Sequence, residues 1–217
     1  MGAIGKGLAT GRVAWALTLA MAVLIVMCNG CSDGMRDSEA AGSGVAALAP
    51  AYSTLDAYPV SDMSGYDAFD AGDETVFVSM TVADIAAEMR AGSTFAVFCG
   101  FADCPWCNAL VPYLNDVALE RGVRVGYLDT RADPAWQSNT DIADYDLFVD
   151  LFGSHLSDDD EGVPHLYTPF VIFIRGGEVA AIQDGTVPSQ EDAHDVLSAE
   201  QEAELVQALN DKFDKLV

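Results

Sequence analysis

The sequence predicts an α/β fold in which helices flank a mixed central sheet. From Glu74 onward, apolar runs of strand length alternate with amphipathic segments of helix length. This alternation favours parallel strands, and a later pair of strands joined by two glycines adds an antiparallel hairpin. Residues 74–217 number 144, which is enough for one domain with a core of its own.

The first predicted strand and helix have clear boundary signals. Residues 74–80, ETVFVSM, form an apolar, β-branched run that is typical of a strand. The helix that follows has Thr81 as its N-cap, Asp84 at the third helical position and Gly92 just past its end. Thr and Asp at this spacing form a capping box, and glycine tolerates the backbone conformation that ends a helix.

Three further elements continue the alternation. Residues 93–101 are predicted to form a buried strand, residues 104–122 a helix and residues 123–130 another apolar strand. Each is bounded by glycine or by turn residues, which indicates short connections.

The chain ends in a hairpin and a helix. The segment PFVIFIRGGEVAAIQDG reads as two strands that turn at its paired glycines. The closing helix begins after Ser198, with Gln201 completing a capping box. One of its faces is apolar, which indicates packing on the sheet; this face consists of Leu205, Leu209, Phe213 and Leu216.

Residues 1–30 are interpreted as a signal peptide. Lys6 and Arg12 form a positive start, and the uncharged run at 13–27 has the length of a signal h-region rather than of a membrane span. Cys31, which follows a small residue, resembles the lipidated cysteine of bacterial lipoproteins. The alternatives to a lipoprotein signal are a plain secretory signal and an uncleaved anchor. Under each of the three interpretations, the domain that follows is exported.

Residues 31–73 are predicted to be a flexible tether. They are rich in Ala, Ser, Gly and Asp and sustain no helical or alternating period. Such a composition buries too little apolar surface to offset the entropy of ordering. The aromatic residues within the segment leave open some docking against the domain.

The chain after Gly30 is strongly acidic. It carries eight Lys or Arg side chains against 34 Asp or Glu, which is a net charge of −26. Nucleic acid and anionic membrane surfaces would be repelled, which argues against either as a partner. The negative charge otherwise indicates only that the protein is kept soluble. A salt-adapted source organism would produce the same excess of acidic over basic side chains.

Three of the five cysteines, Cys99, Cys104 and Cys107, lie within nine residues. Their spacing matches the first three ligands of a plant-type iron–sulfur site, but no fourth cysteine follows. A zinc site would need one of the three histidines, none of which is paired at ligand spacing. A metal site is therefore the weaker interpretation, and no metal or other cofactor is predicted.

A redox centre fits better, because Cys104 lies where a strand gives way to a helix. Unsatisfied N–H groups and the macrodipole at a helix N-terminus stabilise a thiolate. Cys107 lies one turn further along the same face, where it can resolve a mixed disulfide. Pro105 fits the first helical turn, and Trp106 would place a flat ring beside the sulfurs, as a substrate contact or as a shield. A buried structural bridge would show the same CxxC pattern.

The segment FAVFCGFADCPWCNALVP resembles the active-site region of the thioredoxin superfamily. The later segment YTPFVIFIRGGEVAAIQDG resembles the second signature of that superfamily. Together they cover most of residues 74–217. The resemblance implies a thioredoxin-like fold with a redox-active disulfide between Cys104 and Cys107. In its general features the chain is similar to the bacteriocin-transport accessory branch.

The same resemblance implies a substrate-binding wall opposite the dithiol. Pro169 would be the cis-proline of the superfamily, with Thr168 before it. In this family the preceding residue exposes its backbone to pair with substrate like an added strand, so Thr168 and Pro169 are expected to bind substrate, together with Trp106.

Two features depart from the superfamily pattern. Many members carry a buried carboxylate before the CxxC motif, which helps deprotonate the second cysteine, whereas this chain has Phe98. The chain before Thr168 is also longer than a minimal member needs, so an inserted helical segment is predicted at about 131–167, after the third strand. This insert either overhangs the active site or is a solvated excursion without a role in recognition.

These observations predict an exported thiol–disulfide oxidoreductase, anchored as a lipoprotein to the outer face of the cytoplasmic membrane. Cys104 would be the nucleophile and Cys107 the resolving thiol. The expected partners are cysteine-containing exported proteins or peptides, a membrane or extracytoplasmic redox partner and, through the anchor, the lipid bilayer.

A non-catalytic accessory or binding lipoprotein with a structural CxxC bridge is the alternative. The direction of electron flow stays open. Cys99 is either a buried, inert thiol or a third redox partner for the pair.

Overall fold

The computed structural model describes residues 52, 55–70 and 72–217. The predicted signal peptide, the lipid acceptor Cys31 and the first part of the tether lie outside these residues. Within the described part of the chain, no helix has the length and apolar character needed to cross a membrane.

A five-stranded mixed sheet forms the centre of the domain, in the order β1-β3-β2-β6-β7. β1 (Phe77–Ser79), β3 (Val125–Asp129) and β2 (Phe95–Gly100) are parallel to one another. β6 (Phe170–Arg175) runs antiparallel to β2, and β7 (Glu178–Asp184) runs antiparallel to β6. The predicted α/β fold with a mixed sheet is confirmed, and the strand order and directions are those of a thioredoxin-like fold.

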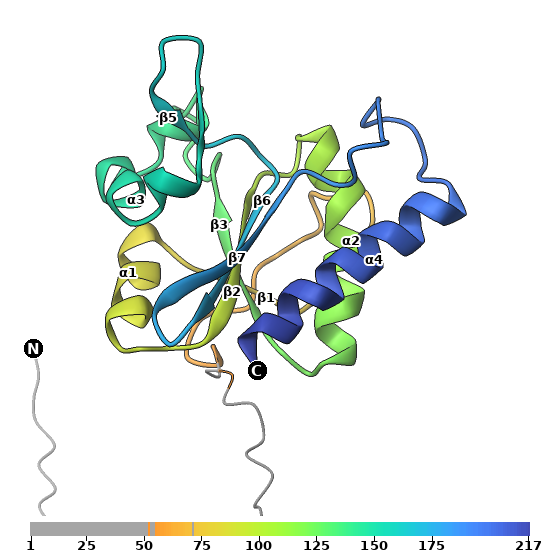
Figure 1. Cartoon of the computed structure of the whole chain (residues 1–217), viewed down its shortest axis with the longest axis horizontal. Coiled ribbons are helices and arrows are strands. Elements are labelled where there is room, and N and C mark those ends of the chain that lie inside the picture. The colour runs from red at the N-terminus through yellow and green to blue at the C-terminus, as the bar shows by residue number, and fades with distance from the viewer. Residues whose placement is uncertain (1–51, 53–54, 71) are drawn as a thin grey trace, which may run out of the picture. The chain divides into compact units, whose positions relative to one another are not determined.

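Two pairs of helices cover the two faces of this sheet (Figure 1). α1 (Val82–Arg90) and α3 (Tyr145–Phe152) bury apolar side chains in the core on one face. α2 (Pro105–Glu120) and α4 (Ala199–Phe213) do so on the other. Short 3₁₀ helices complete the described helical elements: η1 (Asn139–Asp141), η2 (Gly153–His155) and η3 (Asp214–Leu216).

The predicted helix starts and the predicted hairpin are present. The Thr81 side chain accepts the Asp84 N–H while the Asp84 carboxylate accepts the Thr81 N–H, which is the expected capping box. Ser198 and Gln201 cap α4 in the same way. Both glycines between β6 and β7 have positive φ, as their tight turn requires.

The insert after β3 belongs to the domain core. Phe148 and Phe152 of α3 are fully buried on the α1 side of the sheet, so this helix is not a solvated excursion. Within the insert, an acidic turn joins two short strands, β4 (Ser157–Asp158) and β5 (Pro164–His165), into a small hairpin.

Part of the predicted tether also belongs to the domain, which corrects the predicted boundary at Glu74. Leu55 is fully buried, and Met63 and Tyr66 are 2% and 3% exposed. These apolar residues show no regular period, but they fill the core on both faces of the sheet without forming a helix or strand of their own.

The same segment also covers the edge of the sheet. The Ser79 N–H donates to the Pro59 carbonyl at 2.8 Å, and the Ser61 N–H donates to the Phe77 carbonyl at 3.0 Å. An uncovered edge strand would leave backbone groups of this kind unpaired. The segment therefore has a structural reason to stay on the domain.

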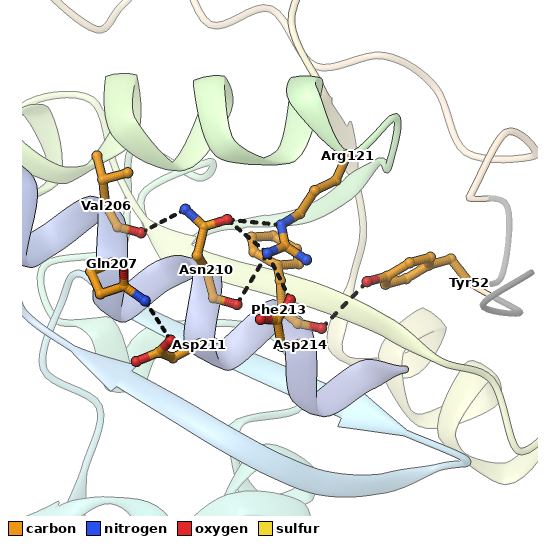
Figure 2. Close-up of polar contacts among 8 residues, drawn as sticks. All are labelled: Tyr52, Arg121, Val206, Gln207, Asn210, Asp211, Phe213 and Asp214. Carbon is orange, nitrogen blue, oxygen red and sulfur yellow. Dashed lines mark hydrogen bonds and ion pairs between the residues drawn. The ribbon is translucent and has the colours of Figure 1, made fainter.

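The end of α4 is held against α2 by Arg121, which directly follows α2 (Figure 2). The Arg121 Nε and Nη2 atoms donate to Asn210 Oδ1 at 3.1 and 2.7 Å. Its guanidinium pairs with Asp214 at 2.8 Å and lies 5.5 Å from the centre of the Phe213 ring. The Tyr52 hydroxyl donates to the Phe213 carbonyl at 3.3 Å from the other side.

Candidate active site

The CPWC motif lies at the junction of β2 and α2. β2 ends at Gly100, and a short connector leads to Cys104, which is the N-cap of α2. Pro105 occupies the first helical turn, where its missing N–H costs nothing. The Cys104 sulfur accepts the Cys107 N–H at 3.2 Å, so it satisfies one of the unpaired donors of the helix start.

The two cysteines of the motif differ in their access to solvent. Cys104 is 4% exposed, whereas Cys107 is fully buried beneath it. All three cysteines of the described residues are free thiols, and among them Cys104 has the most exposed surface. A substrate sulfur can therefore reach Cys104 first.

Thr168 and Pro169 lie opposite Cys104, as predicted. The Thr168 hydroxyl donates to the Cys104 sulfur at 3.8 Å, and the Cys104 thiol donates to the Thr168 carbonyl at the same distance. The Thr168–Pro169 peptide bond is cis, which is the isomer that the resemblance implies. The structure thus brings Cys104, Cys107 and the Thr168–Pro169 segment together.

Trp106 lies at the surface beside the dithiol and is half-buried. It lines a small pocket of about 290 Å³ together with residues 184–188 and Gln190, at and just after the end of β7. The neighbouring Asp103 is exposed to solvent. Trp106 is therefore placed where a polypeptide bound at Cys104 would contact its ring.

Local hydrogen bonds separate the acidities of the two thiols. The hydrogen bond from the Cys107 thiol lowers the pKa of Cys104 to about 7, with help from the Cys107 and Trp106 N–H groups and from the Thr168 hydroxyl, while burial opposes the shift. Burial raises the pKa of Cys107 far above its ordinary value. Near neutral pH the outer sulfur is therefore substantially a thiolate, and the inner one keeps its proton.

Cys99 faces away from this pair. Side chains alternate along β2, so Cys99 enters the core shared with α1 and α3, whereas Cys107 lies in the core shared with α2 and α4. Cys99 is fully buried, and burial raises its pKa. The sheet separates Cys99 from Cys107, so Cys99 is the inert thiol rather than a third redox partner.

The structure adds a residue that the sequence analysis missed. Asn139 of η1 donates to the Leu166 carbonyl at 2.9 Å and to the Thr168 hydroxyl at 3.4 Å. The buried Thr130 hydroxyl donates in turn to Asn139 Oδ1 at 3.0 Å. The insert therefore holds the Thr168 segment in place through Asn139. The capping-box spacing of Ser138 and Asp141 was the available signal for η1.

Asn108 has a similar role on the other side of Cys104. Its Nδ2 atom donates to the Ala102 carbonyl at 2.6 Å and to the Cys104 carbonyl at 3.1 Å. Its Oδ1 atom accepts the Asp67 N–H at 2.8 Å, from the segment predicted as tether. Asn108 thus fixes the connector that carries Cys104.

Across the described ranges, no three His, Cys, Asp or Glu side chains lie close enough together to hold a metal ion.

No protein-family model matches the sequence, and no curated protein matches it either. Among solved structures it is similar to a candidate oxidoreductase with a thioredoxin fold, at 13% identity over 51% of this chain and 83% of that chain, with a TM-score of 0.37. It is also similar to oxidised thioredoxin O2 from Arabidopsis thaliana, at 13% identity over 50% and 82% of the two chains and a TM-score of 0.34. A thioredoxin-fold protein from Helicobacter pylori is 10% identical over 70% and 94%, with a TM-score of 0.29.

The assignment of fold rests on the chain's own geometry. The strand order, the start of α2 at the CPWC motif and the cis bond before Pro169 together make the described domain thioredoxin-like in fold.

Proposed function

We propose that the protein is a thiol–disulfide oxidoreductase that exchanges disulfides with proteins or peptides through Cys104 and Cys107. The position of the Cys104 sulfur carries this proposal. It caps a helix N-terminus, accepts the Cys107 N–H at 3.2 Å and has the lowered pKa of about 7 that a nucleophilic thiol needs.

In the reducing direction the reaction has two steps. The Cys104 thiolate attacks one sulfur of a substrate disulfide, the substrate S–S bond breaks, and the departing sulfur leaves as a thiolate that takes a proton from solvent. Cys107 then loses its proton and attacks the Cys104 sulfur, which releases the second substrate thiolate. Two electrons pass to the substrate, and a disulfide joins Cys104 to Cys107; the oxidising direction is the reverse.

The surroundings of Cys104 fit a polypeptide substrate. The Thr168 carbonyl faces Cys104, so an extended chain could pair with it while its own sulfur reaches Cys104. Trp106 and the pocket beside it would contact flanking residues of the same chain.

The site of action is proposed from the N-terminal sequence. A signal peptide and the anchor at Cys31 would place the domain on the outer face of the cytoplasmic membrane. Disulfides persist in that compartment, so the substrates would be exported proteins or peptides that contain cysteine. A membrane or extracytoplasmic redox partner would reset the dithiol.

Insulin reduction by dithiothreitol tests the activity. The wild-type protein should accelerate the reaction, Cys104→Ser should not, and Cys99→Ala should match the wild type because Cys99 faces the other core. Equal rates with wild type and Cys104→Ser would overturn the proposal. Failure of iodoacetamide to modify Cys104 after mild reduction would instead favour a binding lipoprotein with a structural bridge.

A further inference from the structure

The Thr168 hydroxyl can point its proton in more than one direction. A hydroxyl has one proton to donate and two lone pairs that accept. Only a donating hydroxyl favours the thiolate of Cys104, because a hydrogen bond to the charged sulfur stabilises the charge. The Thr168 oxygen lies 3.8 Å from the Cys104 sulfur, so the direction of this proton bears directly on the reactivity of the sulfur.

The insert after β3 fixes the orientation of the Asn139 amide. The Thr130 hydroxyl, which is fully buried, donates to Asn139 Oδ1 at 3.0 Å. The Leu166 carbonyl can only accept, and it lies 2.9 Å from Asn139 Nδ2. If the amide were turned over, two carbonyl oxygens would face each other. The hydrogen-bond partners therefore require that the amide nitrogen faces Leu166.

The fixed amide in turn decides how the Thr168 hydroxyl is used. Asn139 Nδ2 carries two protons, and it also donates to the Thr168 oxygen at 3.4 Å. Toward Asn139 the Thr168 oxygen is thus an acceptor, and its own proton is left for the Cys104 sulfur. An oxygen in place of the Asn139 nitrogen would accept the same proton and draw it away from the sulfur.

The backbone before Thr168 is held at alternate residues. The Tyr145 hydroxyl of α3 accepts the Leu166 N–H at 3.1 Å and donates to the Pro164 carbonyl at 3.3 Å. Asn139 donates to the Leu166 carbonyl from η1. The N–H and the carbonyl of Leu166 are both bonded and its side chain is fully buried, so Thr168 has little freedom to move away from Asn139.

Resting on the proposed function, we propose that Asn139 is a positioning residue that turns the Thr168 hydroxyl proton toward the Cys104 sulfur and so sets the reactivity of this thiol. Asn139 acts through Thr168 rather than on the sulfur itself. Its amide keeps the Thr168 oxygen an acceptor, and the hydroxyl passes the effect on to the sulfur. The insert thereby tunes the site from outside the CPWC motif.

The acidity of Cys104 agrees with this arrangement. The hydrogen bond from Cys107 is the largest cause of the lowered pKa of about 7, and the hydrogen bond from Thr168 lowers the pKa further. Among the titratable and charged groups around the sulfur, Cys107 is in contact, Asp103 is exposed, and the Arg131 guanidinium lies 4.7 Å from the centre of an aromatic ring of the connector. A substitution that adds no charge should therefore shift this pKa through hydrogen bonding.

Alkylation of the reduced protein by iodoacetamide, followed on the Cys104 peptide across a range of pH, tests the proposal. Asn139→Leu removes the amide without adding a charge. Its rate at neutral pH should fall about 2- to 5-fold, because the Thr168 proton is no longer directed to the thiolate and the pKa of Cys104 rises. Above about pH 9 the rates should converge, since Cys104 is then ionised in both proteins. A purely structural role would change the rate over the whole pH range.

A double-mutant cycle shows whether the effect passes through the hydroxyl. Thr168→Val already lacks the proton that Asn139 directs, so adding Asn139→Leu to it should shift the profile no further. Thr140→Val is the matched control from the same 3₁₀ helix. It removes a hydroxyl that donates to the Ser138 hydroxyl at 2.9 Å and should leave the profile unchanged.

Asn139→Asp provides a second variant, with the shape of the original side chain. One oxygen can still accept the Thr130 hydroxyl, while the other replaces the donor and should take the Thr168 proton. Alkylation at neutral pH should slow at least as much as in Asn139→Leu. The slowing should be smaller in the Thr168→Val background, where only the added charge acts.

The outcomes separate this proposal from the proposed function. An alkylation profile of Asn139→Leu or Asn139→Asp that coincides with the wild type would overturn the role of Asn139 and leave the oxidoreductase in place. An equal shift with and without the Thr168 hydroxyl would do the same. A wild-type protein that reduces insulin no faster than Cys104→Ser would instead overturn the proposed function, whatever the alkylation profiles show.

Discussion

At the scale of single residues, the candidate site depends on a few hydrogen bonds to one sulfur. The Cys107 N–H and the Thr168 hydroxyl both donate to the Cys104 sulfur, and the pKa of this thiol falls to about 7. Each donor favours the thiolate, because a hydrogen bond to the charged form stabilises that form. The reactivity of Cys104 should therefore respond to the loss of a single donor.

Thr168→Val tests one of these donors. The variant keeps the side-chain shape but loses the hydroxyl, so the pKa of Cys104 should rise and its modification by iodoacetamide at neutral pH should slow about 3- to 10-fold. The folded pKa is about 7, so the thiolate gains as pH rises through that value, and the rate profile of the variant should shift to higher pH.

The control for this substitution is Thr140→Val, which removes a hydroxyl that donates to the Ser138 hydroxyl at 2.9 Å. Its alkylation profile should coincide with that of the wild type. A Thr168→Val profile that also coincides would show that the hydroxyl does not tune Cys104.

At the scale of elements, caps and periods predicted most of the fold. Thr81, Ser198 and the glycines of the β6–β7 hairpin mark boundaries that the structure confirms. The β4–β5 hairpin was not predicted, because strands of two residues carry no period to detect. The docking of residues 55–70 was not predicted either, since isolated apolar residues such as Leu55 reveal their partners only in three dimensions.

The residues of the candidate site also fall into two groups, those that the sequence could indicate and those that it could not. Cys104, Cys107 and Pro169 lie in local motifs, so the resemblance could indicate them. Asn139 acts from the insert, and Asn108 is bonded by the Asp67 N–H from the segment predicted as tether. No local spacing links such residues, so only the tertiary structure brings them together.

The contact between α4 and α2 provides an element-scale prediction. Arg121→Met keeps an apolar stem against Phe213 but removes the bonds to Asn210, so the free energy of unfolding should fall by about 1–2 kcal/mol in urea titrations. Asp214→Asn should cost less than about 0.5 kcal/mol, because the Asp214 side chain is 65% exposed and the pair is screened by water. A larger loss of unfolding free energy in Asp214→Asn than in Arg121→Met would contradict this account.

At the scale of the whole molecule, the segment before Glu74 should stabilise the domain. A chain that begins at residue 74 loses the cover of the β1 edge and the buried side chains of Leu55, Met63 and Tyr66, each worth about 2 kcal/mol. A chain that begins at residue 52 should unfold at nearly the same urea concentration as the full chain, and one that begins at residue 74 at a much lower concentration. Equal midpoints would show that the segment contributes nothing.

The net charge of the chain, −24, gives a second prediction at this scale. Cationic cystamine should oxidise the reduced protein faster than anionic glutathione disulfide, by at least about tenfold at low salt, because the acidic surface concentrates cations. Salt screens exposed charges, so this ratio should shrink as salt is added. A ratio independent of salt would exclude electrostatic steering.

Because Cys99 and Cys107 face opposite sides of the sheet, labelling of the thiols can report how often the core around Cys99 opens. A thiol-reactive label added to the native state should mark Cys104 and spare the buried Cys99, and peptide mass mapping would tell the two sites apart. Label on Cys99 would then record openings of the core between the sheet and helices α1 and α3, which buries this side chain.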